Sequence, residues 1–317
     1  MSLAPHVRTL GRGPGRSRSL TQDEAADAMR IMLSGQAAPE AIGALLMLLR
    51  MKGETPAEIA GLAGVAQAAL PPMPAAALDW PCYAAGRTRG RPWFLLSARL
   101  VALAGHKVLL HGWNGADPKV RGGLADAGIP LAATPAEIDR ALSGRGIAYM
   151  PLECAHPALF GLLRLRDVLG LRSGINTVCR MLNPGAAPAS VQGVFHPSYR
   201  LLQADAAALL GWTDLTVIKG GGGEFERHPA KDIAAFGLRG GAPCQLRFRA
   251  LRAETRRLSD PADSETLAAL WAGQCADEFA TDVVLGTAAL ALDTLGHAAP
   301  MTLAAELWAS RGRPHAA

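Results

Sequence analysis

The chain has 317 residues, of which 50% are hydrophobic, 19% charged and 5% aromatic. This length allows a sizeable core in one large α/β domain or two smaller domains, and the few aromatics disfavour a β-sandwich. No apolar run reaches the roughly 18 residues that a membrane span needs, so we expect no membrane partner. The five cysteines contain no CxxC pair, which excludes a zinc knuckle and a disulfide framework. With no apolar signal segment at the N-terminus, we expect a cytoplasmic protein.

The net charge is +5, and the basic residues are segregated along the chain. Residues 1–18 contain four arginines and no acid, and residues 80–116 contain five basic residues and no acid. Such segregation favours a positive surface that binds polyanions or phosphates. The alternative is that arginine replaces lysine on solvated faces, as in proteins encoded by GC-rich genomes.

The N-terminal quarter predicts a flexible tail followed by a helical domain. Residues 1–19 are rich in Gly, Arg, Ser and Pro, and we expect a flexible basic tail. Residues 20–78 form the predicted helical domain, with helices over 20–35, 39–53 and 55–70. Thr21 with Glu24 is a capping box for the first helix, and Thr55 caps the third, which Pro71 and Pro72 end.

Residues 79–154 and 186–317 predict an α/β domain. Helices are expected over 95–105, 120–129, 135–144, 264–273 and 280–296, and strands over 107–112, 146–151, 190–197, 215–223 and 244–251. Alternation of helices and strands predicts a central, mostly parallel sheet flanked by helices. A helix over 156–170 is expected to rejoin the helical domain, together with the rest of about residues 155–185.

Two stretches carry a family resemblance. The first is the turn Lys52-Gly53-Glu54-Thr55 with Glu58, Ile59 and Gly61 after it, and the second runs from His156-Pro157-Ala158 through Arg166 and Arg172 to Asn183-Pro184. With these stretches the chain resembles anthranilate phosphoribosyltransferase and related family 3 glycosyltransferases. The resemblance implies a small helical domain beside a larger α/β domain, and a homodimer formed through the helical domains.

The chain departs from this family at the loop that holds the donor. The transferases hold the pyrophosphate of phosphoribosyl pyrophosphate in a Gly-rich loop after the first strand of the α/β domain. Here Asp79 matches the start of that strand, but the loop carries Arg87, Arg89 and Arg91. The side-chain donors that follow in the family are replaced by apolar residues, among them Phe94.

The acceptor and metal motifs also depart from the family pattern. His111 and Asn114 are possible remnants of the acceptor site, and Arg166 matches the arginine that contacts the acceptor carboxylate. Phe225 replaces the first acid of the metal-binding pair, which leaves Glu226 as a weak remnant. We therefore expect no cofactor, and magnesium only if transferase activity persists.

These departures resemble the YbiB-type branch of the fold, whose members bind nucleic acids without the parent activity. We expect binding of DNA or RNA without marked sequence specificity, through guanidinium–phosphate contacts around the former active-site crevice. The candidate residues are Arg87, Arg89, Arg91, Arg164, Arg166, Arg172, Arg180, Lys219, Gly220, Gly221 and Arg227. Lys219 with the following glycines resembles an anion nest.

Several alternatives stay open. The loop with Arg87, Arg89 and Arg91 is alternatively a solvated loop without a ligand. The glycine run after Lys219 is alternatively a flexible connection, and Arg166 alternatively forms a structural ion pair. Trp93 and Trp113 either stack on bases or pack in the core. No nucleophile or acid–base pair emerges from the spacing, so no catalytic residue is expected. An active phosphoribosyl or glycosyl transferase with a rebuilt donor site is the main alternative, and a silent small-molecule binder is the third.

Overall fold

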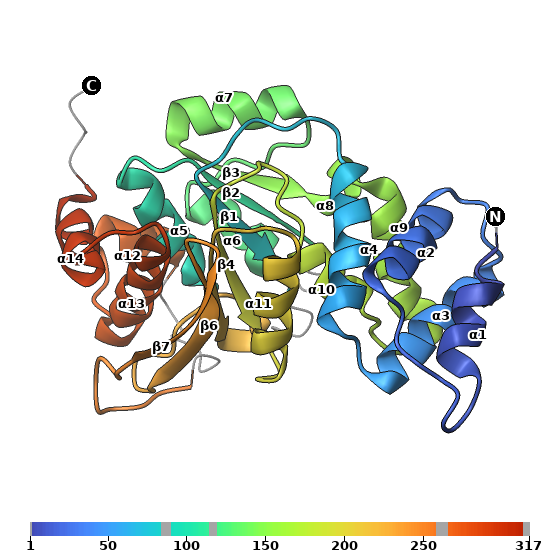
Figure 1. Cartoon of the computed structure of the whole chain (residues 1–317). Helices are drawn as coiled ribbons and strands as arrows, with labels where there is room; N and C mark the ends of the chain where they lie inside the picture. Colours follow the sequence, from blue (N-terminus) through green and yellow to red (C-terminus); the bar gives the residue numbers. More distant parts are fainter. Residues whose placement is uncertain (1, 84–89, 114–118, 258–265, 313–317) are drawn as a thin grey trace.

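The computed structural model describes residues 2–83, 90–113, 119–257 and 266–312. They form a helical lobe and an α/β lobe, with α1 and α14 at opposite ends of the molecule (Figure 1). This architecture confirms the predicted fold class. In the described part of the chain, no helix is both long and apolar enough to cross a membrane.

The helical lobe is assembled from two separate parts of the chain. Its helices are α1 (Ala4–Gly11), α2 (Gln22–Leu33), α3 (Pro39–Lys52), α4 (Pro56–Ala68), α8 (Leu152–Ala155), α9 (Pro157–Leu169) and α10 (Ile175–Arg180). Both predicted caps are present, because Thr21 and Thr55 each accept a hydrogen bond from the backbone N–H three residues later in a complete capping box.

The α1 helix corrects the prediction of a flexible tail over residues 1–19. Leu3 and Leu10 are buried, and His6 Nε2 lies 2.8 Å from Asp27 Oδ2 of α2. These residues recur at helical spacing and form one face, which packs on the lobe while the intervening Arg8 is exposed to solvent. The prediction missed this face because the segment is rich in basic residues.

The α/β lobe contains a seven-stranded sheet in the order β3-β2-β1-β4-β5-β6-β7. The strands are β1 (Leu78–Cys82), β2 (Val108–Gly112), β3 (Ile147–Pro151), β4 (Ala189–Val194), β5 (Asp214–Lys219), β6 (Ile233–Arg239) and β7 (Ala242–Phe248). The first five in this order are parallel, and β6 and β7 pair antiparallel at the edge. Gly240 and Gly241, both with positive φ, form the two-residue turn between β6 and β7.

Helices cover both faces of this sheet (Figure 1). They are α5 (Phe94–Leu103), α6 (Lys119–Asp126), α7 (Pro135–Arg145), α11 (Tyr199–Leu209), α12 (Leu267–Ala272), α13 (Glu278–Thr294) and α14 (Pro300–Ser310), with a short 3₁₀ turn η1 (Gly221–Gly223) after β5. The long, almost wholly buried α13 packs against α5, β4 and β5. The carboxyl ends of β4 and β5 lie next to the helical lobe. Parallel α/β sheets place their ligand crevice at the carboxyl ends of their strands.

Candidate anion-binding site

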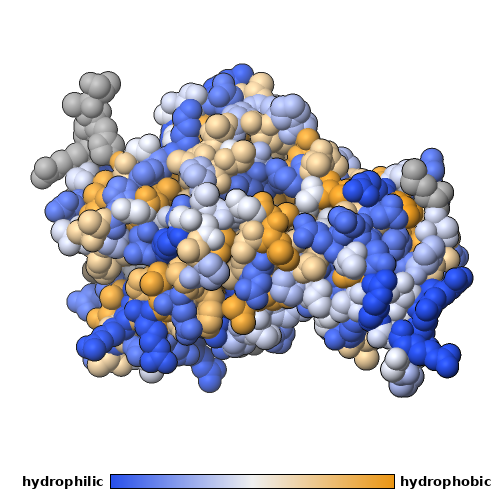
Figure 2. Space-filling model, viewed as in Figure 1, coloured by the Kyte–Doolittle hydropathy of each residue, from blue (hydrophilic) through white to orange (hydrophobic). Residues whose placement is uncertain are grey.

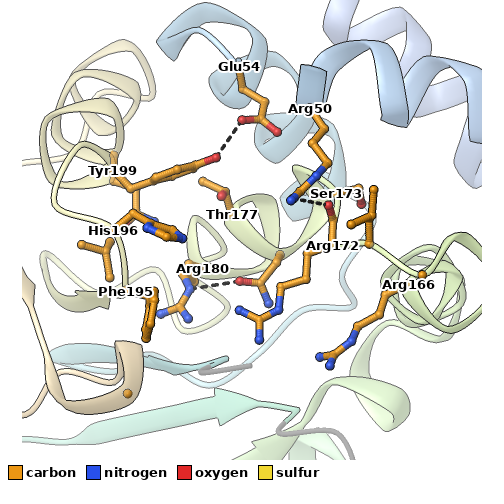
Figure 3. Close-up of a pocket in the computed structure, with 16 residues that line it drawn as sticks. Arg50, Glu54, Arg166, Arg172, Ser173, Thr177, Arg180, Phe195, His196 and Tyr199 are labelled. Carbon is orange, nitrogen blue, oxygen red and sulfur yellow. Dashed lines mark hydrogen bonds between the residues drawn. The ribbon is translucent and has the colours of Figure 1, made fainter. Parts of the chain in front are cut away.

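A cavity of about 370 Å³ lies at the junction of the two lobes. The helical lobe contributes the end of α3, the end of α9 and the turn into α10. The α/β lobe contributes the segment from β4 into α11, together with η1. Figure 3 shows Arg166 and Arg172 across the cavity from Phe195, His196 and Tyr199, with Arg180 beside Phe195.

Four arginines line this pocket and give it its positive charge, namely Arg50, Arg166, Arg172 and Arg180. Arg50 at the end of α3 donates from Nη1 to the backbone oxygen of Arg172 at 2.6 Å. Within the described chain, the side chains of Arg166 and Arg172 make no hydrogen bond or ion pair, although both are half-buried. Two guanidinium groups are therefore available to a ligand.

The pKa of Arg172 reflects how close these arginines lie to one another. Burial lowers the pKa of Arg172, and the neighbouring charges of Arg166, Arg180 and Arg50 lower this pKa further. Like charges held together in a partly dehydrated site repel one another, and a bound anion relieves that repulsion. The arrangement favours a phosphate or carboxylate ligand.

The pocket has one carboxylate among its described lining residues, Glu54. Its Oε2 accepts a hydrogen bond from the Tyr199 hydroxyl at 3.0 Å. Burial, followed by the charge of Glu54, raises the pKa of Tyr199 to about 12, so this hydroxyl is a neutral donor near neutral pH. A single carboxylate leaves the pocket with excess positive charge.

Arg180 corrects one of the predicted phosphate contacts. Its side chain is buried and donates to the carbonyl oxygens of Gly193, Gly223 and Tyr83. These bonds join α10 to the ends of β1 and β4 and to the glycine turn. The guanidinium satisfies buried backbone oxygens, which makes Arg180 a structural residue that contributes charge beneath the pocket.

The glycine turn after Lys219 corrects a second prediction, that of an anion nest at Gly220 and Gly221. The Gly220 N–H donates to Val194 O at 3.2 Å, and the Gly221 N–H donates to Glu226 O at 3.1 Å. These amides are therefore already bonded to the backbone. Glycine is required at 220 because a Cβ there would lie 1.6 Å from the oxygen of Glu224. Lys219 is exposed at the end of β5 and does not line the pocket.

Glu226 corrects the prediction of a metal-site remnant. Its carboxylate is buried, and Oε2 accepts a hydrogen bond from the backbone N–H of Phe94 at 3.0 Å. Phe94 begins α5, so the negative charge of Glu226 sits at the positive end of that helix. The neighbouring Phe225 packs edge-on against Trp80 in the core. A buried carboxylate bonded to a helix end is not available to a metal ion in solution.

His111 likewise belongs to the interior, which corrects the prediction of an acceptor-site remnant. Its Nδ1 lies 2.9 Å from the Tyr83 hydroxyl, and its Nε2 lies 3.1 Å from Asp79 Oδ1. The Ser190 hydroxyl donates to the other oxygen of Asp79 at 2.9 Å. This fully buried network links β1, β2 and β4 and has no exposed face for a ligand. Asn114, the other possible acceptor-site residue, lies outside the described residues.

Of the other predicted arginines, those that the structure describes do not line the pocket. Arg87 and Arg89 lie outside the described residues, and Arg91 does not line the cavity. Arg164 is largely exposed, with Nε 3.8 Å from Asp167 Oδ2.

Arg227 corrects a further prediction, because it is buried and donates to the backbone oxygen of Arg249. Its guanidinium packs over Phe248 instead of facing solvent. The two tryptophans also pack within the protein: Trp93 is buried, and Trp113 contacts Phe160 edge-on.

Pocket residues that were not among the sequence candidates include Arg50, Glu54, Phe195, His196, Tyr199 and Gln203. Arg50 and Glu54 flank the Lys52-Gly53 turn that carried the family resemblance. Phe195 and His196 fall at the carboxyl end of a predicted strand, a position typical of ligand-binding residues. Attention to strand ends would have identified this pair.

Comparison with known proteins agrees with the observed fold. Residues 5–69 match the glycosyl transferase family helical bundle domain. Anthranilate phosphoribosyltransferase from Roseiflexus sp. (strain RS-1) is 36% identical over 213 residues, which are 66% of this chain and 62% of that protein. Anthranilate phosphoribosyltransferase 1 from Ralstonia nicotianae is 32% identical over 219 residues, 66% of this chain and 63% of the relative. The chain thus covers less than two thirds of the length of these relatives.

The structural likeness extends over almost the whole chain. Anthranilate phosphoribosyltransferase from Thermus thermophilus superposes with a TM-score of 0.82 at 23% identity, covering 98% of this chain and 95% of that one. The Saccharomyces cerevisiae enzyme in complex with PRPP and Mg gives 0.76 at 16% identity, covering 98% and 94%. The chain has the fold of glycosyltransferase family 3. More narrowly, this fold is the one seen in anthranilate phosphoribosyltransferase.

Proposed function

We propose that this protein binds DNA or RNA, largely without regard to sequence, through the arginine-lined pocket between its lobes. The observation that carries the proposal is the pair of half-buried guanidinium groups of Arg166 and Arg172, which have no partner in the described chain. Guanidinium groups bond phosphate oxygens in a bidentate manner, and phosphate contacts supply most non-specific affinity for nucleic acids. In this proposal the protein is a YbiB-type member of the fold and acts as a homodimer.

We further propose that anthranilate phosphoribosyltransferase activity is absent. The buried Glu226 supports this, since its carboxylate bonds the first N–H of α5 and so occupies a helix end suited to a phosphate. Phe225 supports it as well, because an apolar side chain stands where the family resemblance places a metal-binding acid. Together these residues weaken both the donor cradle and the magnesium site.

The alternative is a phosphoribosyl or glycosyl transferase with a rebuilt donor site. It is favoured by the 36% identity to an anthranilate phosphoribosyltransferase and by the pocket itself, because clustered arginines also suit a phosphorylated sugar. The two functions differ in their ligand and in their need for a metal ion.

Two titrations separate these functions. The first uses single- and double-stranded oligonucleotides at two salt concentrations, and the second uses phosphoribosyl pyrophosphate with magnesium. We expect saturable, salt-sensitive binding of oligonucleotides and no magnesium-dependent binding of the donor. Tight, magnesium-dependent donor binding, or product formation by the purified protein, would show that the transferase alternative is correct.

A pair of variants locates the binding surface. Replacing Arg166 and Arg172 together by Ala should weaken binding to all sequences alike and flatten the dependence of log K on log salt by up to about two units. Arg164→Ala is the matched control, since Arg164 lies on the same helix but outside the pocket and is largely exposed. Equal losses in the control and the double variant would contradict the assignment to the pocket.

A further inference from the structure

An aromatic pair stands at the mouth of the pocket, directly after β4. Phe195 is 56% exposed, and its ring centroid lies 5.0 Å from that of His196, with the planes 82° apart. Phe195 is the sole aromatic residue among the exposed large hydrophobic residues of the described chain. Exposed aromatic faces beside clustered arginines are the combination with which proteins bind unstacked bases.

A second observation comes from Gln203 on α11, which also lines the pocket. Its side chain is only 1% exposed, yet its Oε1 is buried without a hydrogen-bond partner, and the described chain gives its amide no other bond. A buried amide oxygen without a partner destabilises a fold unless a ligand satisfies it. A glutamine amide presents one acceptor and two donors, which match the edge of a nucleobase.

The pocket therefore offers two kinds of contact on opposite sides. Figure 3 shows Phe195, His196 and Tyr199 on one side and Arg166 and Arg172 on the other. A nucleotide has the matching two-part chemistry, a flat aromatic base and a phosphate. The cavity of about 370 Å³ falls at the lower end of the size range of small-ligand pockets, which suits a single nucleotide unit.

We propose that this pocket receives one unpaired base of a nucleic-acid strand, stacked against Phe195 and bonded to Gln203, while the flanking phosphates bind Arg166 and Arg172. The inference rests on the proposed nucleic-acid function and adds a substrate class to it, namely single strands. In a duplex the bases are paired and stacked inside the helix, so a duplex reaches the arginines through its phosphates alone. The protein thus prefers single-stranded over double-stranded nucleic acid.

The test compares three probes of equal charge at one salt concentration by fluorescence anisotropy. They are a single-stranded oligonucleotide, the same strand with abasic sites in place of all bases, and a hairpin duplex with the same number of phosphates. We expect the single strand to bind about tenfold more tightly than the other two, because stacking of one base and its hydrogen bonds are lost in both.

Variants assign that preference to the pocket. Phe195→Ala and Gln203→Leu should each reduce binding of the single strand toward that of the abasic strand and leave duplex binding unchanged. Leu201→Ala is the matched control, because Leu201 is 53% exposed on α11 but does not line the pocket. Gln203→Leu removes a buried unpaired amide, so it should unfold in urea at the same concentration as the natural protein or a higher one.

The outcomes separate this inference from the function on which it rests. Equal binding of all three probes, or unchanged single-strand preference in both pocket variants, overturns the base pocket and leaves nucleic-acid binding intact. Absence of binding to every probe overturns both. Photo-cross-linking of a 5-iodouracil strand gives an independent readout: we expect the adduct on residues 195–203, and an adduct confined to residues 8–18 would overturn the assignment.

Discussion

Arg172 and Arg180 lie eight positions apart, but only Arg180 is bonded to the protein through its side chain. Arg180 donates to three carbonyl oxygens within the protein, whereas the side chain of Arg172 has no partner among the described residues. Desolvation lowers the pKa of both groups. The difference between a structural and a ligand-binding arginine is therefore set by the backbone oxygens within reach, which composition cannot show.

This difference predicts opposite effects of the same substitution. Arg180→Met leaves the oxygens of Gly193, Gly223 and Tyr83 without this donor, and each unsatisfied buried group costs about 1–3 kcal/mol, so we expect a loss of roughly 3 kcal/mol or more. Arg172→Met removes a partly dehydrated cation from a cluster of cations and should leave stability unchanged or raised. Urea unfolding of both variants measures the difference, and equal destabilisation would contradict the assigned roles.

At the scale of elements, the turn between β5 and β6 shows how glycines position the pocket. Gly193 and Gly220 let β4 and the turn approach so closely that a Cβ at either position would lie about 2 Å or less from a backbone atom of Glu224. That approach brings the oxygen of Gly223 within 2.8 Å of Arg180 Nη1. The glycine run thus allows close backbone packing and places a carbonyl oxygen that accepts from Arg180, rather than N–H groups that bind an anion.

Two glycine substitutions test this role. Gly220→Ala forces backbones apart and should destabilise the protein severely, by several kcal/mol, or prevent folding, as overpacking does. Gly161→Ala is the control, because Gly161 lies inside α9 with open space around it. Alanine there should stabilise the protein by about 0.5–1 kcal/mol. Thermal unfolding compares the two, and a tolerated Gly220→Ala would refute the packing argument.

The N-terminus of α2 predicts a specific dependence of stability on pH. The Arg18 guanidinium, followed by the Thr21 N–H, lowers the pKa of Glu24 from 4.5 to about 2. Because the folded-state pKa lies below the unfolded value, the stabilisation is fully present above pH 4.5 and is lost as the pH falls toward 2.

The variant Glu24→Gln isolates this contribution, since glutamine keeps an acceptor for the capping box but carries no charge. We expect the natural protein to exceed the variant in stability by a constant amount above pH 4.5, and the gap to close between pH 4.5 and 2. Urea unfolding across this range measures the gap. A gap that stayed constant down to pH 2 would mean that the ion pair with Arg18 contributes nothing.

The elements show which parts of the fold the sequence could predict. The caps at Thr21 and Thr55 and the helix start at His156, which precedes Pro157, depend on residues close in the sequence, and the structure confirms all three. The analysis missed β6, α11 and α14. Strand β6 alternates buried and half-buried residues without a clear polar face, and both helices start without a capping side chain. Elements with clear local signals were therefore predicted correctly, whereas elements without such signals were missed.

The candidate site was less predictable than the fold, for a physical reason. Arg166 and Arg172 were identified from the family resemblance, but Gln203, Phe195 and Arg50, which line the same pocket, come from distant segments that meet only in the folded molecule. Conversely, Arg227 and His111 have side chains suited to binding a ligand, but both are buried in the protein interior. Whether a polar side chain faces a pocket or the core depends on long-range packing, which motif spacing does not encode.

At the scale of the whole molecule, the described chain presents two positive surfaces. One is the pocket between the lobes. The other is α1 with the loop after it, where Arg8, Arg12 and Arg16 are exposed. Figure 2 shows strongly hydrophilic side chains at the lower right, over the region that α1 and this loop occupy in Figure 1. The two surfaces differ in that only the pocket is built from both lobes.

A ligand that contacts both lobes should stabilise the molecule as a unit. A single-stranded oligonucleotide at about 100 times its Kd adds roughly 2.7 kcal/mol if it binds the folded state alone. We expect calorimetry at constant ionic strength to show the helical and α/β lobes melting together at a higher temperature. The shift should disappear when Arg166 and Arg172 are both replaced by Ala, because the ligand then loses its contacts with the helical lobe. Replacing Arg8, Arg12 and Arg16 by Gln should retain most of it, since those residues lie on one lobe. If the shift instead survives in the pocket variant and vanishes in the α1 variant, the polyanion binds along α1 and the pocket has another ligand.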